Sequence, residues 1–405
     1  MTKSNVHKGS KTAEKSTIDK ITAKCSSENS YEQKKTIVNK SKTTNNQLKV
    51  YSKVDSKVDL NDIKTISLID INKIDSNGFT PLMYVCAFGS SLIESVKWLL
   101  SNGADPNIGK YKMLTPNMFE TQLPNMNALM ICCRYCTSNL DVECVKLLIN
   151  SGANLEYRSS KNYTVLMHLC ENCNTEASIE CAKLLLSKGA SVSDVSGNNF
   201  TPLMLACKFC NTKYDVDLVK LLIDNNGDVN SRRKDRRNEY TLLLYTVSHT
   251  NKYKVKCTKL LIDRGIDLKA DTSTLIACTL ATRTRLTIEC AKLLIDAGIN
   301  LNCVDYKGMT ALMCACYHRN KSQIEIDFVK LLINAGADLN IQDNNGLVAL
   351  LHACNCPCTD KNIECIKLLI NTNQYTGMTI YRHNCTDNCQ LVQLLEEHDI
   401  HLHNN

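Results

Sequence analysis

The sequence Thr310-Ala-Leu-Met-Cys-Ala-Cys316, followed by Val329-Lys-Leu-Leu-Ile-Asn-Ala-Gly-Ala-Asp-Leu-Asn340, decides the fold, because related copies of it recur along the chain. A second clear copy reads Thr201-Pro-Leu-Met-Leu-Ala-Cys207 and continues as Val219-Lys-Leu-Leu-Ile223. The lysine of the second part recurs in steps of 33 to 49 residues, at positions 97, 146, 183, 220, 259, 292, 330 and 367. A unit of this size cannot bury its own apolar face, so the period predicts a stack of small units. Stacked units present a long surface, which favours binding over catalysis.

Each repeated unit contains signals for a turn, two helices and a helix stop. Asp343-Asn-Asn-Gly346 has Asp first and Gly fourth, as a type I turn prefers. Thr201 is a good N-cap, and Pro202 fits the first position of the following helix. Apolar residues recur at helical spacing on two segments, with Leu82, Val85 and Cys86 on the first and Val142, Val145, Leu148 and Ile149 on the second. Each second helix is predicted to end at a left-handed glycine, at Gly103, Gly152, Gly189, Gly227, Gly265, Gly298 or Gly336.

This unit resembles the ankyrin repeat, because Thr-Pro-Leu, Val-Lys-Leu-Leu and Gly-Ala-Asp-x-Asn occur in register across residues 60–400. The resemblance implies an all-α ankyrin-repeat solenoid of stacked helix-turn-helix units, with β-hairpin finger loops along one edge. It also implies a protein that is not an enzyme, uses no cofactor and binds other proteins.

Two features depart from the usual family pattern. The family usually has His after Thr-Pro-Leu, whereas this chain has Met at the corresponding positions 83, 130, 167, 204 and 313. The period is also about four residues longer than the usual ~33, and the excess lies between the two helices, so we expect the first helix to be one turn longer. In its pattern Leu-Met-x-Ala-Cys, its long segment between the helices, its pattern Ile-Glu-Cys-x-Lys-Leu-Leu-Ile and its Asn/Lys/Ile-rich composition, the chain is similar to the ankyrin repeat family of amoeba-infecting giant viruses (mimivirus-like). That resemblance implies a viral protein with a host-cell partner.

The composition divides the chain into a tail and an array. Residues 1–58 carry 13 Lys against 5 acidic residues and are rich in Ser, Thr and Asn, so we expect a disordered, solvating tail. The tail has no dense basic block, so nucleic acid is not an expected partner. The array is predicted over 59–400, with an N-terminal half-cap at 59–78, eight full repeats at about 79–376 and a shortened C-terminal cap at 377–400. Residues 401–405 are expected to be a flexible end.

The cysteines and the apolar pattern indicate the compartment. The chain has 23 Cys, and many recur at fixed positions of the unit, as Cys170, Cys207 and Cys316 do. Buried thiols behave as small apolar groups, and a reducing compartment keeps them free. No stretch approaches the ~18 apolar residues of a membrane helix, and the N-terminus has no apolar signal region. We therefore expect a cytoplasmic location (the host cytoplasm if the protein is viral), with no membrane partner and no small-molecule substrate.

Zinc is the alternative explanation for the pairs Cys133/Cys136, Cys170/Cys173 and Cys207/Cys210. A zinc site needs four ligands at about 2.3 Å from one ion, whereas neighbouring packed helices are about 10 Å apart. The first Cys of each pair also lies on the apolar face. We therefore predict core thiols, with no catalytic, metal-binding or cofactor-binding residues.

Partner binding is predicted at the finger tips and at an insertion after Gly103. The Arg-rich tip 231–237 could meet an acidic partner, resemble a nuclear import signal or be a solvated loop; the insertion could equally be neutral. Tyr and Arg most often anchor interfaces. The candidate residues are Ser76, Asn77, Tyr111, Phe119, Lys161, Asn162, Arg232, Arg233, Arg236, Arg237, Tyr306, Lys307, Asn344 and Asn345.

Two functions are compatible with these features. The first is a protein-protein interaction scaffold that uses the finger tips and the inner face of the first helices. The alternative is a substrate adaptor for a host ubiquitin ligase, although no F-box is seen in the sequence.

Overall fold

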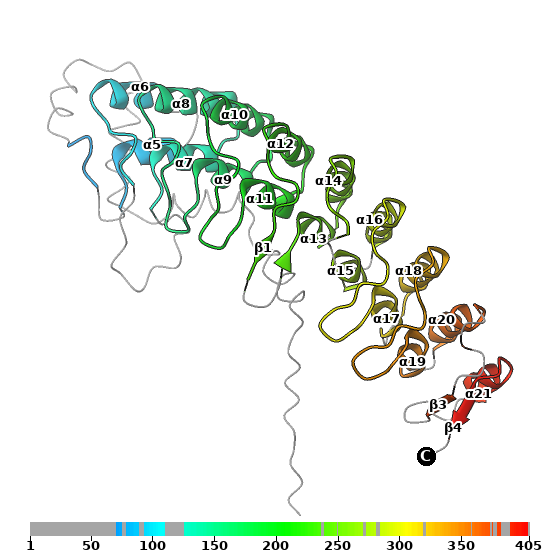
Figure 1. Cartoon of the computed structure of the whole chain (residues 1–405). Helices are drawn as coiled ribbons and strands as arrows, with labels where there is room; N and C mark the ends of the chain where they lie inside the picture. Colours follow the sequence, from blue (N-terminus) through cyan, green and yellow to red (C-terminus); the bar gives the residue numbers. More distant parts are fainter. Residues whose placement is uncertain are drawn as a thin grey trace, which may run out of the picture.

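The computed structural model describes residues 70–74, 78–88, 93–109, 125–235, 239–248, 250–269, 273–280, 284–318, 321–357, 359–372, 375, 379–381 and 389–403. The predicted tail 1–58 lies outside these residues, as does most of the predicted half-cap 59–78. Within the described ranges, pairs of antiparallel helices follow one another in chain order and stack into a curved array (Figure 1).

The first helices of the pairs form one row of the array and the second helices form the other (Figure 1). The first helices are α5 (Pro81–Phe88), α7 (Ala128–Arg134), α9 (Val165–Cys170), α11 (Pro202–Phe209), α13 (Leu242–Val247), α15 (Thr274–Leu280), α17 (Ala311–Cys316) and α19 (Ala349–Cys354). The second helices are α6 (Ile93–Ser101), α8 (Asn139–Asn150), α10 (Glu176–Ser187), α12 (Lys213–Asp224), α14 (Lys252–Asp263), α16 (Arg285–Asp296), α18 (Gln323–Asn334) and α20 (Asp360–Ile370).

Local signals start and stop these helices as the sequence predicts. Thr201 Oγ1 accepts a hydrogen bond from the backbone N–H of Met204 at the start of α11. Gly152 has a φ of 84° after α8, where Ala153 N donates to Leu148 O at 3.0 Å. The prediction for Gly227 is wrong by one residue, since Asn226 has the positive φ, 67°. Asn tolerates this conformation better than other residues with a Cβ.

The extra length of each unit does not lie in the first helix, which corrects the expectation from the spacing. The first helices span 6 to 8 residues, whereas the second helices from α8 to α18 span 12. A polar cap sets the early start of the second helix. In α12, Thr212 Oγ1 accepts from Asp215 N, and the Asp215 carboxylate accepts from Thr212 N.

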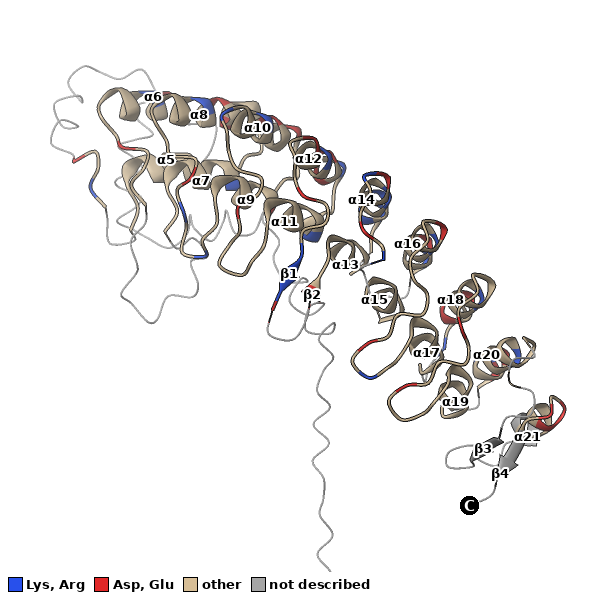
Figure 2. Ribbon diagram, in the orientation of Figure 1, with Lys and Arg blue, Asp and Glu red and all other residues tan. Residues whose placement is uncertain are grey.

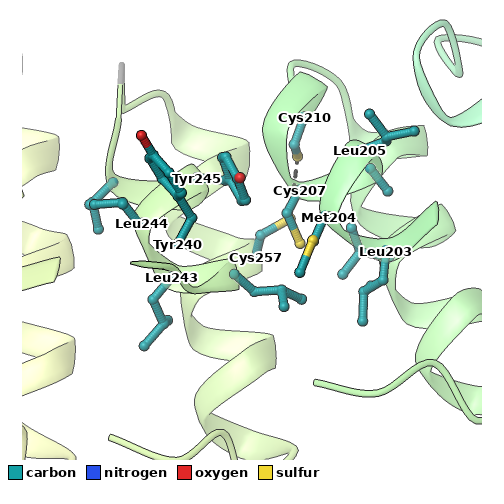
Figure 3. Packing of buried hydrophobic residues seen from close by; sticks show 14 of the residues in the cluster. Leu203, Met204, Leu205, Cys207, Cys210, Tyr240, Leu243, Leu244, Tyr245 and Cys257 are labelled. Atoms are coloured by element: carbon teal, nitrogen blue, oxygen red, sulfur yellow. Dashed lines mark hydrogen bonds between the residues drawn. The ribbon is translucent and has the colours of Figure 1, made fainter. Parts of the chain in front are cut away.

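The core runs between the two helix rows and continues from unit to unit. The five methionines that follow the first Leu of their units are no more than 1% exposed, as are Leu203 and Cys207. Figure 3 shows this packing between α11, α13 and α14. Apolar contact therefore occupies the position of the family's usual His brace.

Asparagine side chains join neighbouring units at the return segment after each second helix. The Oδ1 atom of Asn302 accepts from Asp338 N at 2.9 Å, and Asn230 Oδ1 accepts from Asp267 N at 2.7 Å. Asn72 and Asn107 make the equivalent bonds. In these four units, the Asn at the last position of the Gly-Ala-Asp-x-Asn pattern therefore links one unit to the next.

A smaller unit follows α20 at the C-terminal end. It contains α21 (Cys389–Glu396), and β3 (Thr379–Tyr381) pairs in parallel with β4 (His401–His403). The sequence placed residues 401–405 in a flexible end, whereas 401–403 form β4 because β3 provides partners for their backbone. No helix in the described ranges is long and apolar enough to cross a membrane.

Candidate protein-binding surface

The fingers project from the edge of the array where the first helices begin (Figure 1). Two of the fingers close through the Asp-x-x-Gly turns that the sequence predicts. Gly308 N donates to Asp305 O at 3.0 Å, and Gly346 N donates to Asp343 O at 2.9 Å. The Asp side chain adds to the turn, because Asp305 Oδ1 also accepts from Lys307 N and Met309 N.

Adjacent fingers are hydrogen-bonded to each other near their tips. Asn344 N donates to Lys307 O at 2.9 Å, and Asn344 Nδ2 donates to Tyr306 O at 3.1 Å. The pair of fingers before α9 and α11 is joined in the same way, since Gly197 N donates to Lys161 O at 2.9 Å and Asn162 Nδ2 donates to Val195 O. These bonds hold the exposed tips in a defined order.

The structure exposes one group of the predicted residues and leaves another outside the described ranges. The exposed candidates are Lys161, Asn162, Tyr306, Lys307, Asn344 and Asn345. Tyr306 stands out, because its side chain is 79% exposed, the largest exposure among the described large apolar residues. The candidates outside the described residues are Ser76, Asn77, Tyr111, Phe119, Arg236 and Arg237.

Arg233 and Arg232 are not free tip residues, which corrects their expected place at an exposed finger tip. Arg233 lies in β1 (Arg233–Lys234), which pairs antiparallel with β2 (Glu239–Tyr240). The Arg233 guanidinium lies over the rings of Phe200 and Tyr240, 4.5 and 4.8 Å from their centroids. Arg232 is also partly buried, with Nη1 3.6 Å from Glu239 Oε2.

Charged and aromatic side chains also lie at the C-terminal ends of the first helices. Arg134 Nη1 at the end of α7 lies 2.7 Å from Glu171 Oε2, and this pair is mostly buried. Farther along, Tyr317 at the end of α17 is 55% exposed and meets His352 edge-on. Lys208 at the end of α11 lies over two aromatic rings.

Sequence reasoning did not predict Lys208, Tyr317 or the aromatic partners of Arg233. The sequence does contain a signal for aromatic packing. In three units, an aromatic residue just before the first helix is followed five residues later by a second aromatic ring, and the two rings pack together. The pairs are Phe79 with Tyr84, Tyr163 with His168 and Tyr240 with Tyr245.

The sequence matches the family described as "Ankyrin repeats (3 copies)" in five overlapping segments that span residues 108–343, and "Ankyrin repeat" over residues 77–111. The chain belongs to the ankyrin repeat family. It is 35% identical over 77 residues to human "Transient receptor potential cation channel subfamily A member 1", a match that covers 19% of this chain and only 7% of the channel. Among solved structures it is similar to the human ASB11 ankyrin repeat domain, with a TM-score of 0.47 and 20% identity over 60% of this chain and 97% of the other.

The cysteines of this ankyrin array fill its core. The 19 cysteines between Cys86 and Cys365 whose side chains the structure describes are free thiols, and 18 of them are buried. The Sγ atoms of Cys136 and Cys181 lie 3.3 Å apart, and those of Cys210 and Cys257 lie 3.2 Å apart, so each pair links one unit to the next. Burial raises the pKa of Cys290 to about 11, which keeps that thiol neutral at pH 7.

A metal site needs several ligands at one point. In the described part of the chain, no group of three or more His, Cys, Asp or Glu side chains could hold a metal ion. The expectation that the whole protein binds no zinc stays a prediction.

Proposed function

We propose that this ankyrin array is a non-enzymatic scaffold that binds a partner protein through its finger tips and the inner face of its first helices. The hydrogen bonds between adjacent fingers carry this proposal. They fix the backbone that carries the exposed side chains of Tyr306, Lys307 and Lys161 before any partner arrives. A surface that is already ordered loses less conformational entropy on binding.

The chemistry of the exposed side chains supports the same function. Tyr306 offers a large ring with a polar tip, and aromatic residues of this kind are enriched at interface hot spots. The second helices instead present paired charges to solvent, such as Glu180 with Lys183 on α10. Isolated exposed pairs of this kind contribute little energy, so the finger side is the better candidate for recognition.

The resemblance to ankyrin proteins of amoeba-infecting viruses supports a finer proposal, a cytoplasmic protein of an amoebal host as the partner. Affinity capture tests both levels. The tagged full chain is incubated with amoebal lysate and cross-linked, and bound proteins are identified by mass spectrometry. A partner should be retained by the wild-type chain and depleted by Tyr306→Ala.

The matched control is Leu140→Ala. Leu140 is 48% exposed at the start of α8, far from the fingers along the helix axis. Both variants should melt at the wild-type temperature. If the capture is equally reduced by both variants, or by neither, the finger surface is not the binding site.

The ubiquitin-ligase adaptor is the alternative outcome of the same capture. An adaptor should bring down a ligase core together with a second, substrate protein. Recovery of a partner without any ligase subunit contradicts the adaptor and agrees with the scaffold.

A further inference from the structure

The guanidinium of Arg233 is held in a single position by neighbouring residues. Arg233 lies over Phe200 and Tyr240, and its Nε donates to Asn198 O at 2.8 Å. Asn198 belongs to the preceding finger, so Arg233 also ties two fingers together. A guanidinium that is already ordered loses little entropy when it binds an anion.

A second cation approaches the same ring. The Nζ atom of Lys208, at the end of α11, lies 4.8 Å from the centroid of Phe200 and 4.9 Å from that of Phe209. The ring attracts each cation, whereas the two cations repel each other. An anion bound close to both would remove that repulsion.

A buried donor completes the cluster. The hydroxyl of Tyr245 on α13 is buried and donates no hydrogen bond to the described residues, and the whole residue is 4% exposed. Burial raises the pKa of this hydroxyl, and the nearby Arg233 guanidinium opposes the rise. The ring centroid of Tyr245 lies 5.7 Å from that of Phe200 and 6.2 Å from that of Tyr240, the two rings that hold Arg233; Figure 3 shows Tyr245 beside Tyr240. A buried hydroxyl without a partner is unfavourable, and an incoming oxygen acceptor would satisfy it.

The charge around this cluster is positive. The described hairpin has Arg232, Arg233 and Lys234 against Asp235 and Glu239. Arg232 and Lys234 both lie 3.6 Å from Glu239, so they share its carboxylate. Figure 2 shows β1 in blue next to α11.

We propose that Arg233, Lys208 and the Tyr245 hydroxyl form a seat for one anionic side chain of a partner peptide, a carboxylate or a phosphate. The inference rests on the proposed scaffold function and names the chemistry of its partner. Two cations and one O–H donor match the several acceptor atoms of an oxyanion, and the surrounding rings lower the local dielectric and strengthen the contact.

Fluorescence anisotropy with the full chain tests the seat. The probes are three fluorescein-labelled peptides of equal length, one with eight Glu, one with eight Gln, and one Gln peptide that carries a single phosphoserine. The Glu peptide should bind, and the Gln peptide should bind at least about tenfold more weakly, since it cannot form charge-assisted hydrogen bonds with the two cations. The phosphoserine peptide shows whether a phosphate can replace the carboxylate.

Variants separate the seat from general attraction by charge. Arg233→Gln and Lys208→Gln should each weaken binding of the Glu peptide by about tenfold. Tyr245→Phe should also weaken binding, although it leaves the melting temperature unchanged or higher because it removes an unpartnered buried hydroxyl. A merely structural role for Tyr245 would not produce that combination.

The matched control is Arg264→Gln. It removes the same charge from the Arg264–Asp224 pair, which lies after the C-terminal end of α14. Equal losses for Arg233→Gln and Arg264→Gln, or a Glu peptide that binds no better than the Gln peptide, would overturn the seat. A captured partner that ignores Arg233→Gln and Tyr245→Phe but is lost with Tyr306→Ala would overturn the seat and leave the scaffold proposal intact.

Discussion

The Nε2 atom of His352 lies 3.1 Å from Oδ2 of Asp343, and both side chains are buried. An ionised carboxylate only accepts, so His352 donates this bond. Burial alone would raise the pKa of Asp343, but backbone N–H bonds from Leu347 and Asn345 lower it below its ordinary value. A finger turn and a first helix are thereby joined in one polar contact.

His168 occupies the same position in another unit without that partner. It follows Ser159 by nine residues, as His352 follows Asp343. Ser159 Oγ accepts from Tyr163 N, and both ring nitrogens of His168 are buried with no hydrogen bond in the described structure. Burial, with the positive charges of Arg134 and Lys161, lowers the pKa of His168 well below 6.5.

We predict that His168 makes the array sensitive to acid. The unfolded chain binds a proton near pH 6.5 and the folded chain does so only at lower pH, so stability falls as the pH drops below 6.5. The loss approaches about 1.4 kcal/mol per pH unit. Urea unfolding at pH 7.5 and 5.5 should show a larger loss for wild type than for His168→Leu, which copies Leu205 of the next unit.

The pH dependence of wild type has to be compared with that of His168→Leu, because other groups also titrate between pH 5.5 and 7.5. Burial raises the pKa of Asp215 to about 6, which shifts stability in the opposite direction. An identical pH dependence in wild type and His168→Leu would contradict the prediction.

Ser159→Asp should reduce this acid sensitivity. The new carboxylate would stand to His168 as Asp343 stands to His352, and would raise the pKa of His168 toward its ordinary value. The unfolding midpoint should then change less between pH 7.5 and 5.5. Ser196→Asp is the control, because the residue nine positions later is Leu205, and its pH dependence should stay that of wild type.

Loss of an inter-unit asparagine should destabilise the array. Asn302→Ala removes the acceptor for Asp338 N and should cost about 0.5–1.5 kcal/mol in urea unfolding. Lys269→Ala changes the same position of the preceding unit, where the side chain is exposed, and should stay within about 0.5 kcal/mol. Equal costs would show that the asparagine bridge contributes nothing specific.

The thiols should react slowly in the native protein. Burial excludes reagent from 18 described thiols and raises the pKa of Cys314 to about 12. A disulfide reagent such as DTNB should therefore label quickly only Cys303, which is partly exposed, and cysteines outside this set of 19. Rapid reaction of all 23 thiols without denaturant would contradict the core assignment.

Metal analysis provides the companion measurement. The purified, tag-free chain should contain well under one equivalent of zinc. One tightly held equivalent that is lost with Cys170→Ser or Cys207→Ser would show that these cysteines are ligands.

Removal of residues 1–58 should leave the melting temperature unchanged. The segment is strongly basic and has no apolar period, so we predict that it contributes no core contacts. Limited proteolysis should yield a resistant fragment that begins near Val58. A lower melting temperature for the truncated chain would show that the tail packs on the array.

The local features of the array could be predicted from the sequence. Thr201 and Asp343 form their caps and turns with residues two to four positions away, so the sequence alone specifies the partners. Buried cysteines such as Cys207 could be predicted from the helical period. The length of the first helix could not be predicted from the sequence. The polar cap fixes the start of the second helix, so the extra residues of the unit lie outside the first helix.

The sequence by itself determined the repeated unit and its core, because these depend on periodicity and on contacts within one turn of helix. Only the tertiary structure decided that Arg233 is held between two rings and that the Tyr245 hydroxyl is buried beside them without an acceptor. Arg233 meets Phe200 across 33 positions of the chain. Such contacts depend on how each unit stacks on the next, and no local pattern encodes that geometry.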